Sequence, residues 1–211
     1  MKLVVVDYGL GNLYNLGNAF ARCGRTVEVS HDPAVLRAAD ALILPGVGAF
    51  GDGKRRLEAL GLDAVIRSAA EAGAAILGIC LGMQLLMDTS EEFGLHQGLG
   101  LIAGEVLHFH SHPAFDRSAK VPHMGWNDIL PQREHPLLRG LAAPDMYFVH
   151  SYYARAADAS QVLATARYGG VEFCSVVGRG RILGCQFHPE KSSASGLRLI
   201  ENFIGMIEDS L

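Results

Sequence analysis

The pattern of hydrophobic and polar positions divides the chain near residue 100. Before that point, short apolar runs alternate with longer amphipathic segments. The expected strands are 3–6, 26–30, 41–44 and 74–79, and the expected helices are 12–23, a short one from Asp32-Pro33, and 54–72. Continuous aliphatic runs such as Leu3 to Val6 are typical of parallel strands buried on both faces. Strands that alternate with helices predict a doubly wound α/β sheet.

The second half of the chain has a different pattern. Residues 89–100 are polar and carry Glu91 and Glu92, which predicts a surface loop, and a final amphipathic helix is expected at 195–208. Between them lie runs expected to form strands without an intervening long helix: 101–110, 121–130, 146–154, 162–168, 171–177 and 182–187. Gly169-Gly170 is a hairpin signal. This half therefore predicts antiparallel or mixed sheet, and 211 residues suit one α/β domain.

Composition excludes several classes of protein. Lys and Arg number 18 against 22 Asp and Glu, a net charge of −4 that does not favour a broad nucleic-acid surface. No apolar stretch approaches the ~20 residues of a membrane span. A chain that opens with a strand leaves no room for a signal peptide. The four cysteines show no CxxC pair. We expect a cytoplasmic protein with free thiols that binds neither membrane nor nucleic acid.

Residues 74–86 form the most informative stretch. An apolar run leads to Cys80, which lies between Gly78 and Gly82 and is followed by a helical pattern. This is the pattern of a nucleophile elbow, in which a strand turns sharply into a helix and the tip residue is strained. Glycine at the two flanking positions lets the backbones of the strand and the helix approach closely. The N-terminus of the helix favours the thiolate form of the cysteine at the tip. A buried structural cysteine is the alternative that this stretch alone leaves open.

A cysteine nucleophile needs a base, and the base needs an orienting group. The last expected strand ends in Gln-Phe-His-Pro-Glu at 186–190, where Pro189 fixes the turn between His188 and Glu190. We predict that Cys80 attacks, His188 shuttles the proton and Glu190 orients His188. The turn Pro-Gly-Val-Gly at 45–48 follows another strand, at the sheet edge where ligands bind in parallel α/β proteins.

These motifs resemble the class I, triad-type glutamine amidotransferases, through Gly-Ile-Cys-Leu-Gly-Met-Gln at 78–84 and Gln-Phe-His-Pro-Glu at 186–190. More narrowly, the chain is similar to the glutamine amidotransferase subunits of imidazole glycerol phosphate synthases of histidine biosynthesis. The blocks that carry this narrower resemblance are 7–13, 45–50, 122–127, 147–152 and 188–192. The resemblance covers essentially the whole chain. It implies a single domain over residues 1–211, with a flavodoxin-like open sheet, a nucleophile elbow and a C-terminal half richer in antiparallel strands.

The resemblance also implies roles for individual residues. Cys80 would attack the carboxamide of L-glutamine and form a γ-glutamyl thioester that water hydrolyses to glutamate, with His188 as general acid and base and Glu190 as its orienter. The backbone N–H groups of Leu81 and Val47 would form the oxyanion hole. The positions that resemble substrate-binding residues are Gly46, Gly48, Gln84, Glu92, Ser151 and Tyr152. Glu92 suits an α-ammonium group, although a solvated carboxylate is the usual state of a surface Glu.

In the family, the released ammonia passes to a cyclase subunit, a (β/α)₈ barrel that forms a heterodimer with the glutaminase. The cyclase makes imidazole glycerol phosphate and an aminoimidazole carboxamide ribonucleotide. Asn12, Trp126, Tyr147 and Lys191 match interface positions; for Trp126, the single tryptophan, core packing is the alternative. The glycines around Val47 suggest that the oxyanion peptide points wrongly until the cyclase binds its ligand, so the isolated chain should have low activity.

Alternatives remain at this stage. The glutaminase subunits of pyridoxal phosphate synthase and anthranilate synthase are the nearest, and a non-catalytic flavodoxin-like binding module or an unrelated cysteine hydrolase are the others. The turn at 9–11 lacks the third glycine of a dinucleotide site, and the histidines do not cluster with carboxylates at ligand spacing. We therefore expect no cofactor and no metal. His123 and His150 are expected to satisfy hydrogen bonds, because neither has an evident orienting group nearby.

Overall fold

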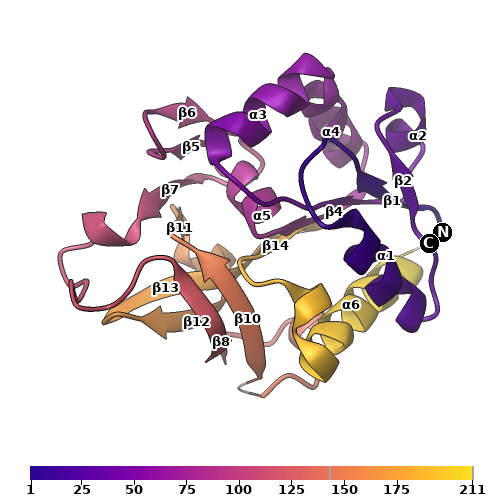
Figure 1. Cartoon of the computed structure of the whole chain (residues 1–211). Coiled ribbons are helices and arrows are strands. Elements are labelled where there is room, and N and C mark those ends of the chain that lie inside the picture. The colour runs from indigo at the N-terminus through magenta and orange to yellow at the C-terminus, as the bar shows by residue number, and fades with distance from the viewer. Residues whose placement is uncertain (143, 211) are drawn as a thin grey trace.

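The computed structural model describes residues 1–142 and 144–210, and an eight-stranded mixed sheet lies at its centre (Figure 1). In spatial order its strands are β2 (Glu28–Ser30), β1 (Leu3–Val6), β3 (Ala41–Leu44), β4 (Ala75–Ile79), β14 (Ile182–Cys185), β13 (Val171–Arg179), β12 (Val162–Tyr168) and β9 (Leu130–Pro131). Strands β2 to β14 in this order are parallel, and β13, β12 and β9 continue the sheet antiparallel. The order β2-β1-β3-β4 is flavodoxin-like, so the predicted fold class is confirmed.

Helices cover both faces of the parallel part of the sheet (Figure 1). Alternation along β1 sends Val5 to one face and Val4 to the other, which explains why these strands are continuously apolar. Helices α1 (Leu13–Arg22) and α6 (Ser193–Glu208) pack on the face of Val5. Helices α2 (Pro33–Arg37), α3 (Phe50–Ala59), α4 (Leu62–Glu71) and α5 (Leu81–Leu85) pack on the opposite face.

Local signals in the sequence explain several boundaries. The side chains of Asn12 and Asp32 cap α1 and α2 by accepting the N–H groups of Asn15 and Ala34, as their residue types favour. Gly169 and Gly170 both have positive φ between β12 and β13, as a primed hairpin turn requires. The described part of the chain also holds four 3₁₀ helices: η1 (Phe109–Ser111), η2 (Pro136–Leu138), η3 (Ala159–Gln161) and η4 (Pro189–Lys191).

The prediction of one helix over 54–72 was wrong. The chain forms α3 and α4 instead, and Gly61 separates them with a φ of 67°, a left-handed conformation that ends a helix. The hydrophobic periodicity did not reveal the break because Leu57 before it and Leu62 after it are buried in the same core. Lys54 of α3 forms an ion pair with Asp63 of α4 at 3.5 Å, which ties the two helices together.

The prediction of one strand over 146–154 was also wrong. The chain leaves β10 (Asp145–His150) at His150 and enters β11 (Tyr152–Ala156) directly afterwards, and the two strands belong to different small sheets. Strand β10 pairs with β8 (His123–Asp128), whereas β11 pairs with β7 (Gly104–His108). Phe148 of β10 and Tyr153 of β11 pack into the core on one face of the main sheet, and Ala154 of β11 packs into the core on the other face.

The expected surface loop at 89–100 contains two short strands, β5 (Thr89–Ser90) and β6 (His96–Gln97), which extend the β11–β7 sheet. This sheet holds the segment that carries Glu91 and Glu92 beside the N-terminus of α3. Within the described residues, no helix has both the length and the apolar character that crossing a membrane requires.

Candidate active site

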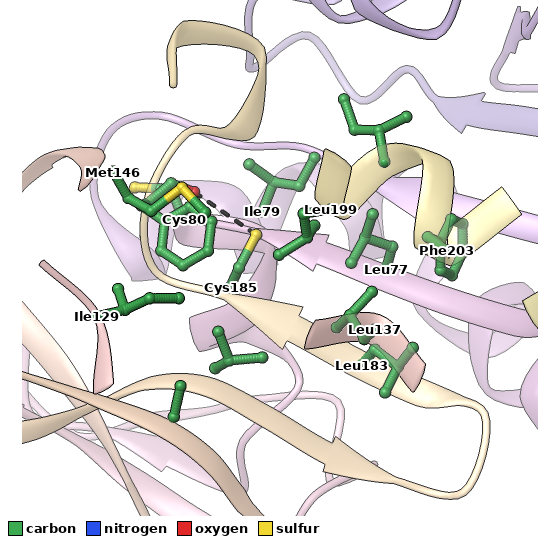
Figure 2. Close-up of a cluster of buried hydrophobic side chains, with 14 of the residues drawn as sticks. Leu77, Ile79, Cys80, Ile129, Leu137, Met146, Leu183, Cys185, Leu199 and Phe203 are labelled. Atoms are coloured by element: carbon green, nitrogen blue, oxygen red, sulfur yellow. Dashed lines mark hydrogen bonds between the residues drawn. The ribbon is translucent and has the colours of Figure 1, made fainter. Parts of the chain in front are cut away.

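Cys80 lies at the sharp turn from β4 into α5, with φ 54° and ψ −109°. These angles are outside the regions that ordinary side chains adopt, so the cysteine is strained. A Cβ on Gly82 would lie 1.8 Å from the carbonyl oxygen of Leu44, and one on Gly78 would lie 2.7 Å from the backbone of Gly82. The packing therefore forces glycine at both positions, as the sequence pattern predicted. Cys80 is 6% exposed and adjoins the buried side-chain layer of Ile79 and Cys185 (Figure 2).

His188 and Glu190 lie beyond the end of β14, the parallel neighbour of β4. The Nδ1 atom of His188 lies 2.9 Å from Oε1 of Glu190, and both side chains are 4% exposed. The His188 backbone is held as well: its N–H donates to the Tyr147 carbonyl at 2.9 Å, and its carbonyl accepts the Ser192 hydroxyl at 2.6 Å. Backbone and side chain together fix the orientation of the imidazole.

The surroundings of His188 favour its protonated form. Burial alone would lower the pKa of His188, but a side-chain interaction with Cys80, followed by the bond to Glu190, raises it to about 10. These interactions favour the imidazolium form of the ring. Its Nδ1 faces Glu190, which leaves Nε2 for the side of Cys80. This is the arrangement that an acid needs to protonate a leaving nitrogen after a cysteine attack.

A cavity of about 370 Å³ opens over Cys80. It is lined by residues from the turn after β3, from the elbow and from the β10–β11 junction: Val47, Gly48, Cys80, Leu81, Gln84, Glu92, Pro122, Val149, His150, Ser151 and Tyr152. Eight of these were candidate site residues in the sequence. Gly46, His188 and Glu190 instead line a narrow crevice that adjoins the cavity at Val47. The fold thus brings together all eleven catalytic, oxyanion and substrate-binding candidates, from segments far apart in the chain.

Glu92 is half-buried in the cavity wall rather than solvated. Its Oε2 accepts the N–H of Phe50, the first residue of α3, at 2.6 Å. The N-cap residue of α3, Ala49, makes no side-chain capping hydrogen bond, so Glu92 caps this helix instead. Burial raises the pKa of Glu92, and the bond from Phe50 opposes that shift. Glu92 thus joins the segment before β6 to α3 and presents a carboxylate to the cavity.

The Pro-Gly-Val-Gly turn is anchored at one end and free at the other. The Tyr8 hydroxyl donates to the carbonyl of Pro45 at 2.6 Å, and a Cβ on Gly46 would lie 2.4 Å from that hydroxyl oxygen. Val47 is 41% exposed, and Gly48 has a φ of 105° with open space around it. Leu81 is the first residue of α5, where backbone N–H groups have no intrahelical partner. Both peptides are candidates to hold an oxyanion above Cys80.

His123 and His150 form a buried pair between β8 and β10. Nδ1 of His150 donates to the Tyr152 carbonyl at 2.8 Å, so its Nε2 must accept from Nδ1 of His123 at 3.1 Å. The Asn127 amide then donates to the remaining nitrogen of His123 at 3.2 Å. Burial lowers the pKa of His123 to about 4 and of His150 to about 3, so both rings are neutral. They satisfy hydrogen bonds, as expected.

Three of the four interface candidates lie in one row. Trp126 is half exposed on β8, opposite Tyr147 of β10, and their rings meet edge to face at 6.1 Å. The ammonium of Lys191 lies 5.6 Å from the centroid of the Tyr147 ring. We call Trp126, Tyr147 and Lys191 the aromatic row. Asn12 caps α1 and lines the crevice beside His188 and Glu190.

Sequence reasoning assigned no role to Gln186, although it quoted the residue within a motif. Gln186 is fully buried, and its Nε2 lies 3.7 Å from the sulfur of Cys80. The available signal was an amide in an otherwise apolar strand end, directly before Phe187 and His188, because buried polar side chains are uncommon and require partners.

Comparison with known proteins gives consistent matches. Residues 4–206 match the family model described as glutamine amidotransferase class-I. The imidazole glycerol phosphate synthase subunit HisH of Geobacillus kaustophilus is 49% identical over 202 residues, which cover 96% of this chain and 95% of that protein. The protein of the same name from Symbiobacterium thermophilum is 47% identical over 99% of this chain and 95% of its own length. A crystal structure described as glutamine amidotransferase superposes with a TM-score of 0.75 at 23% identity, covering 97% of this chain and 98% of that chain, and so shares the fold.

Proposed function

The chain belongs to the class-I glutamine amidotransferases, and from this premise we propose that it is the glutaminase subunit of an imidazole glycerol phosphate synthase. It hydrolyses L-glutamine to glutamate and ammonia in histidine biosynthesis. The observation that carries the assignment is a strained Cys80 at the floor of a cavity, beside a His188 that Glu190 holds at 2.9 Å. The HisH relatives supply the pathway.

In the proposed mechanism, the sulfur of Cys80 attacks the carboxamide carbon of glutamine. The carbonyl oxygen becomes an oxyanion that the N–H groups of Leu81 and Val47 stabilise. The C–N bond then breaks, and protonated His188 gives its proton to the leaving nitrogen, which departs as ammonia. Water, deprotonated by His188, attacks the thioester carbon, and the C–S bond breaks to release glutamate. Glu190 keeps the ring in place through both steps.

The cavity is suited to the amino-acid end of glutamine. Gln84 uses Nε2 for the carbonyl of Tyr152 at 3.0 Å and for Oε1 of Gln186 at 3.1 Å, so its own Oε1 is the atom left for a ligand. An acceptor at Gln84 and a carboxylate at Glu92 together favour an α-ammonium group. Gly48, Ser151 and Tyr152 lie on the wall and are proposed to hold the α-carboxylate. Gly46 contributes by its close packing against Tyr8 and Leu81.

We further propose a cytoplasmic heterodimer with a cyclase subunit, a (β/α)₈ barrel that uses the ammonia to make imidazole glycerol phosphate and an aminoimidazole carboxamide ribonucleotide. The aromatic row and Asn12 are the proposed contact surface. Ammonia released into water would be protonated and lost as a nucleophile, so transfer requires a docked partner.

The test is glutamine hydrolysis by the full chain, measured alone and with a cognate cyclase plus its nucleotide ligand. Val47 lies between two glycines, and we expect its peptide to reorient on docking, so turnover should be low alone and rise in the ligand-bound complex. Cys80→Ala should abolish it. Glutaminase activity that does not change when the cyclase is added would indicate that the protein is a subunit of another amidotransferase complex. No hydrolysis under any condition would overturn the glutaminase assignment.

A further inference from the structure

Gln186 is a buried polar side chain beside Cys80 that the mechanism above leaves without a function. It lies between Cys185, the last residue of β14, and Phe187, and it is fully buried. Its Nε2 approaches the Cys80 sulfur to 3.7 Å, within the range of an N–H···S hydrogen bond. Its backbone N–H donates to the Ser175 carbonyl at 2.9 Å, so the residue is fixed at its base as well as its tip.

The direction of this contact follows from the neighbouring groups. The carbonyl of Tyr152 only accepts, so the nitrogen end of the Gln84 amide must face it. The second N–H of Gln84 then meets Oε1 of Gln186 at 3.1 Å. With its oxygen occupied, Gln186 must turn its NH₂ toward Cys80. A backbone carbonyl therefore determines, through two amides, that a donor and not an acceptor faces the sulfur.

A donor at that position matters for the chemistry. The sulfur of Cys80 carries negative charge as it attacks and again when the thioester is hydrolysed and the sulfur leaves. Hydrogen bonds to charged groups are roughly twice as strong as neutral ones, and more so where water is excluded. Because Cys80 is 6% exposed, few water molecules can solvate the sulfur, and a fixed amide is a suitable replacement.

Building on the proposed function, we propose that Gln186 is a further catalytic residue, whose side-chain N–H bonds the sulfur of Cys80, holds it for attack and stabilises its charge. Gln84 acts through Gln186 as a positioning residue, in addition to facing the substrate. The site thus has two groups on the nucleophile: His188, which exchanges a proton, and Gln186, which keeps its protons and supplies only a dipole.

The test uses Gln186→Met, which keeps an unbranched side chain but removes the donor, and Gln186→Glu, which places a carboxylate toward the sulfur. Glutamine hydrolysis is measured in the ligand-activated complex. For Gln186→Met we expect kcat to fall about 10- to 100-fold, the loss expected for one hydrogen bond to a charged group, with KM within about twofold. Gln186→Glu should be slower still, because it removes the donor and adds repulsion.

A second readout does not depend on turnover. The full chain is treated with iodoacetamide at neutral pH, and peptide mass spectrometry follows alkylation of Cys80 separately from the other cysteines. Both variants should slow alkylation of Cys80. The matched control is Gln132→Met, because Gln132 also uses its side-chain NH₂ as a hydrogen-bond donor, to the Leu130 carbonyl at 3.1 Å and the Thr165 hydroxyl at 2.9 Å, in a sheet edge away from the site. It should leave both rates unchanged.

The outcomes separate this inference from the function on which it rests. A wild-type complex without glutaminase activity refutes the proposed function, while alkylation still reports on Gln186. An active wild type, with variants that retain kcat and alkylation rate, overturns the role of Gln186. A rise in KM at constant kcat also overturns it, since that would mark a substrate contact. Circular dichroism restricts the comparison to folded protein. A Gln186→Met variant that is folded, alkylated slowly and low in kcat supports the proposed role of Gln186.

Discussion

At the scale of single residues, the elbow depends on atoms that are absent from glycine. A Cβ at Gly82 would lie 1.8 Å from the backbone oxygen of Leu44, and no rotation of a side chain can relieve that overlap. We expect Gly82→Ala to lower the free energy of unfolding by about 3 kcal/mol or more, because strand β3 or helix α5 must move. Urea denaturation followed by circular dichroism measures the change.

Gly17 provides the matched control, since it lies within α1 and a Cβ there would have no neighbour within 4 Å. Gly17→Ala should stabilise the protein by about 0.5 to 1 kcal/mol, because alanine restricts the unfolded chain and favours helix. Equal stability of the two variants would show that the elbow tolerates a side chain. That result would contradict the steric reason given for the glycine pattern.

The sequence sufficed for residues whose role follows from type and spacing. Cys80, His188 and Glu190 stand in short motifs, and the structure brings them together. Gln186 shows the limit: its function depends on which end of an amide faces the sulfur, and that is determined by the Tyr152 carbonyl through Gln84. No local pattern encodes a contact among three segments. The signal available in the sequence was an amide residue at the end of an otherwise apolar strand.

At the scale of elements, the pairing of β8 with β10 contains two neutral histidines. The pKa of His123 is lowered to about 4 and that of His150 to about 3, whereas both titrate near 6.5 in the unfolded chain. Between these pKa values the unfolded state holds more protons on the two histidines than the folded state does, so their contribution to stability falls as the pH falls below 6.5. Each additional proton that the unfolded state binds lowers the free energy of unfolding by about 1.4 kcal/mol per pH unit. His188 does not add to this, because it is protonated in both states below 6.5.

We expect His123→Gln to weaken this dependence, because glutamine keeps a donor and an acceptor but does not titrate. Urea denaturation at pH 7, 6 and 5 should show a shallower loss of stability than in wild type. His31, which is exposed, provides the control: His31→Gln should leave the slope unchanged. A slope equal to that of wild type in His123→Gln would mean that His123 already accepts a proton in the folded state.

Element boundaries followed from the sequence where a backbone signal marked them and failed where none did. Asp32 and Pro33 marked the start of α2, and Gly169-Gly170 marked the hairpin. The break at Gly61 was hidden because the apolar positions of α3 and α4 face one core. The change of sheet between β10 and β11 was hidden because both are apolar strands. Their partners, β8 and β7, are distant in sequence and cannot be recognised from a local window.

At the scale of the whole molecule, strand register assembles the site. Strands β4 and β14 are parallel neighbours in which Ile79 lies opposite Cys185, so both chains leave the sheet at the same edge. Cys80 follows the first strand, and Gln186 and His188 follow the second. The turn after β3 brings Val47 to the same edge. The doubly wound pattern predicted this edge, although the pairing of β14 with β4 was not visible in the sequence.

The outer surface beside this edge is the proposed route to the partner. Trp126 is 50% exposed and Met124, two residues earlier on β8, is 63% exposed, which is unusual for large apolar side chains. Lys191 stacks on Tyr147 and directly follows Glu190, so contacts to this row adjoin the triad. We expect Trp126→Ala to weaken binding to the cyclase by about 30-fold or more, as loss of a central aromatic anchor does. Isothermal titration calorimetry measures the affinity.

The control is Leu60→Ala, an exposed apolar residue on the α3–α4 turn. Leu60→Ala should bind the cyclase like wild type, and both variants should unfold at the wild-type temperature, because neither side chain is part of the core. Trp126→Ala should also reduce ligand-stimulated glutamine hydrolysis at subsaturating cyclase and recover when cyclase is in excess, since the mutation removes docking energy and leaves Cys80, His188 and Gln186 in place. If Trp126→Ala binds the cyclase with wild-type affinity, the docking surface does not depend on β8, and the side of the triad where Asn12 caps α1 becomes the candidate.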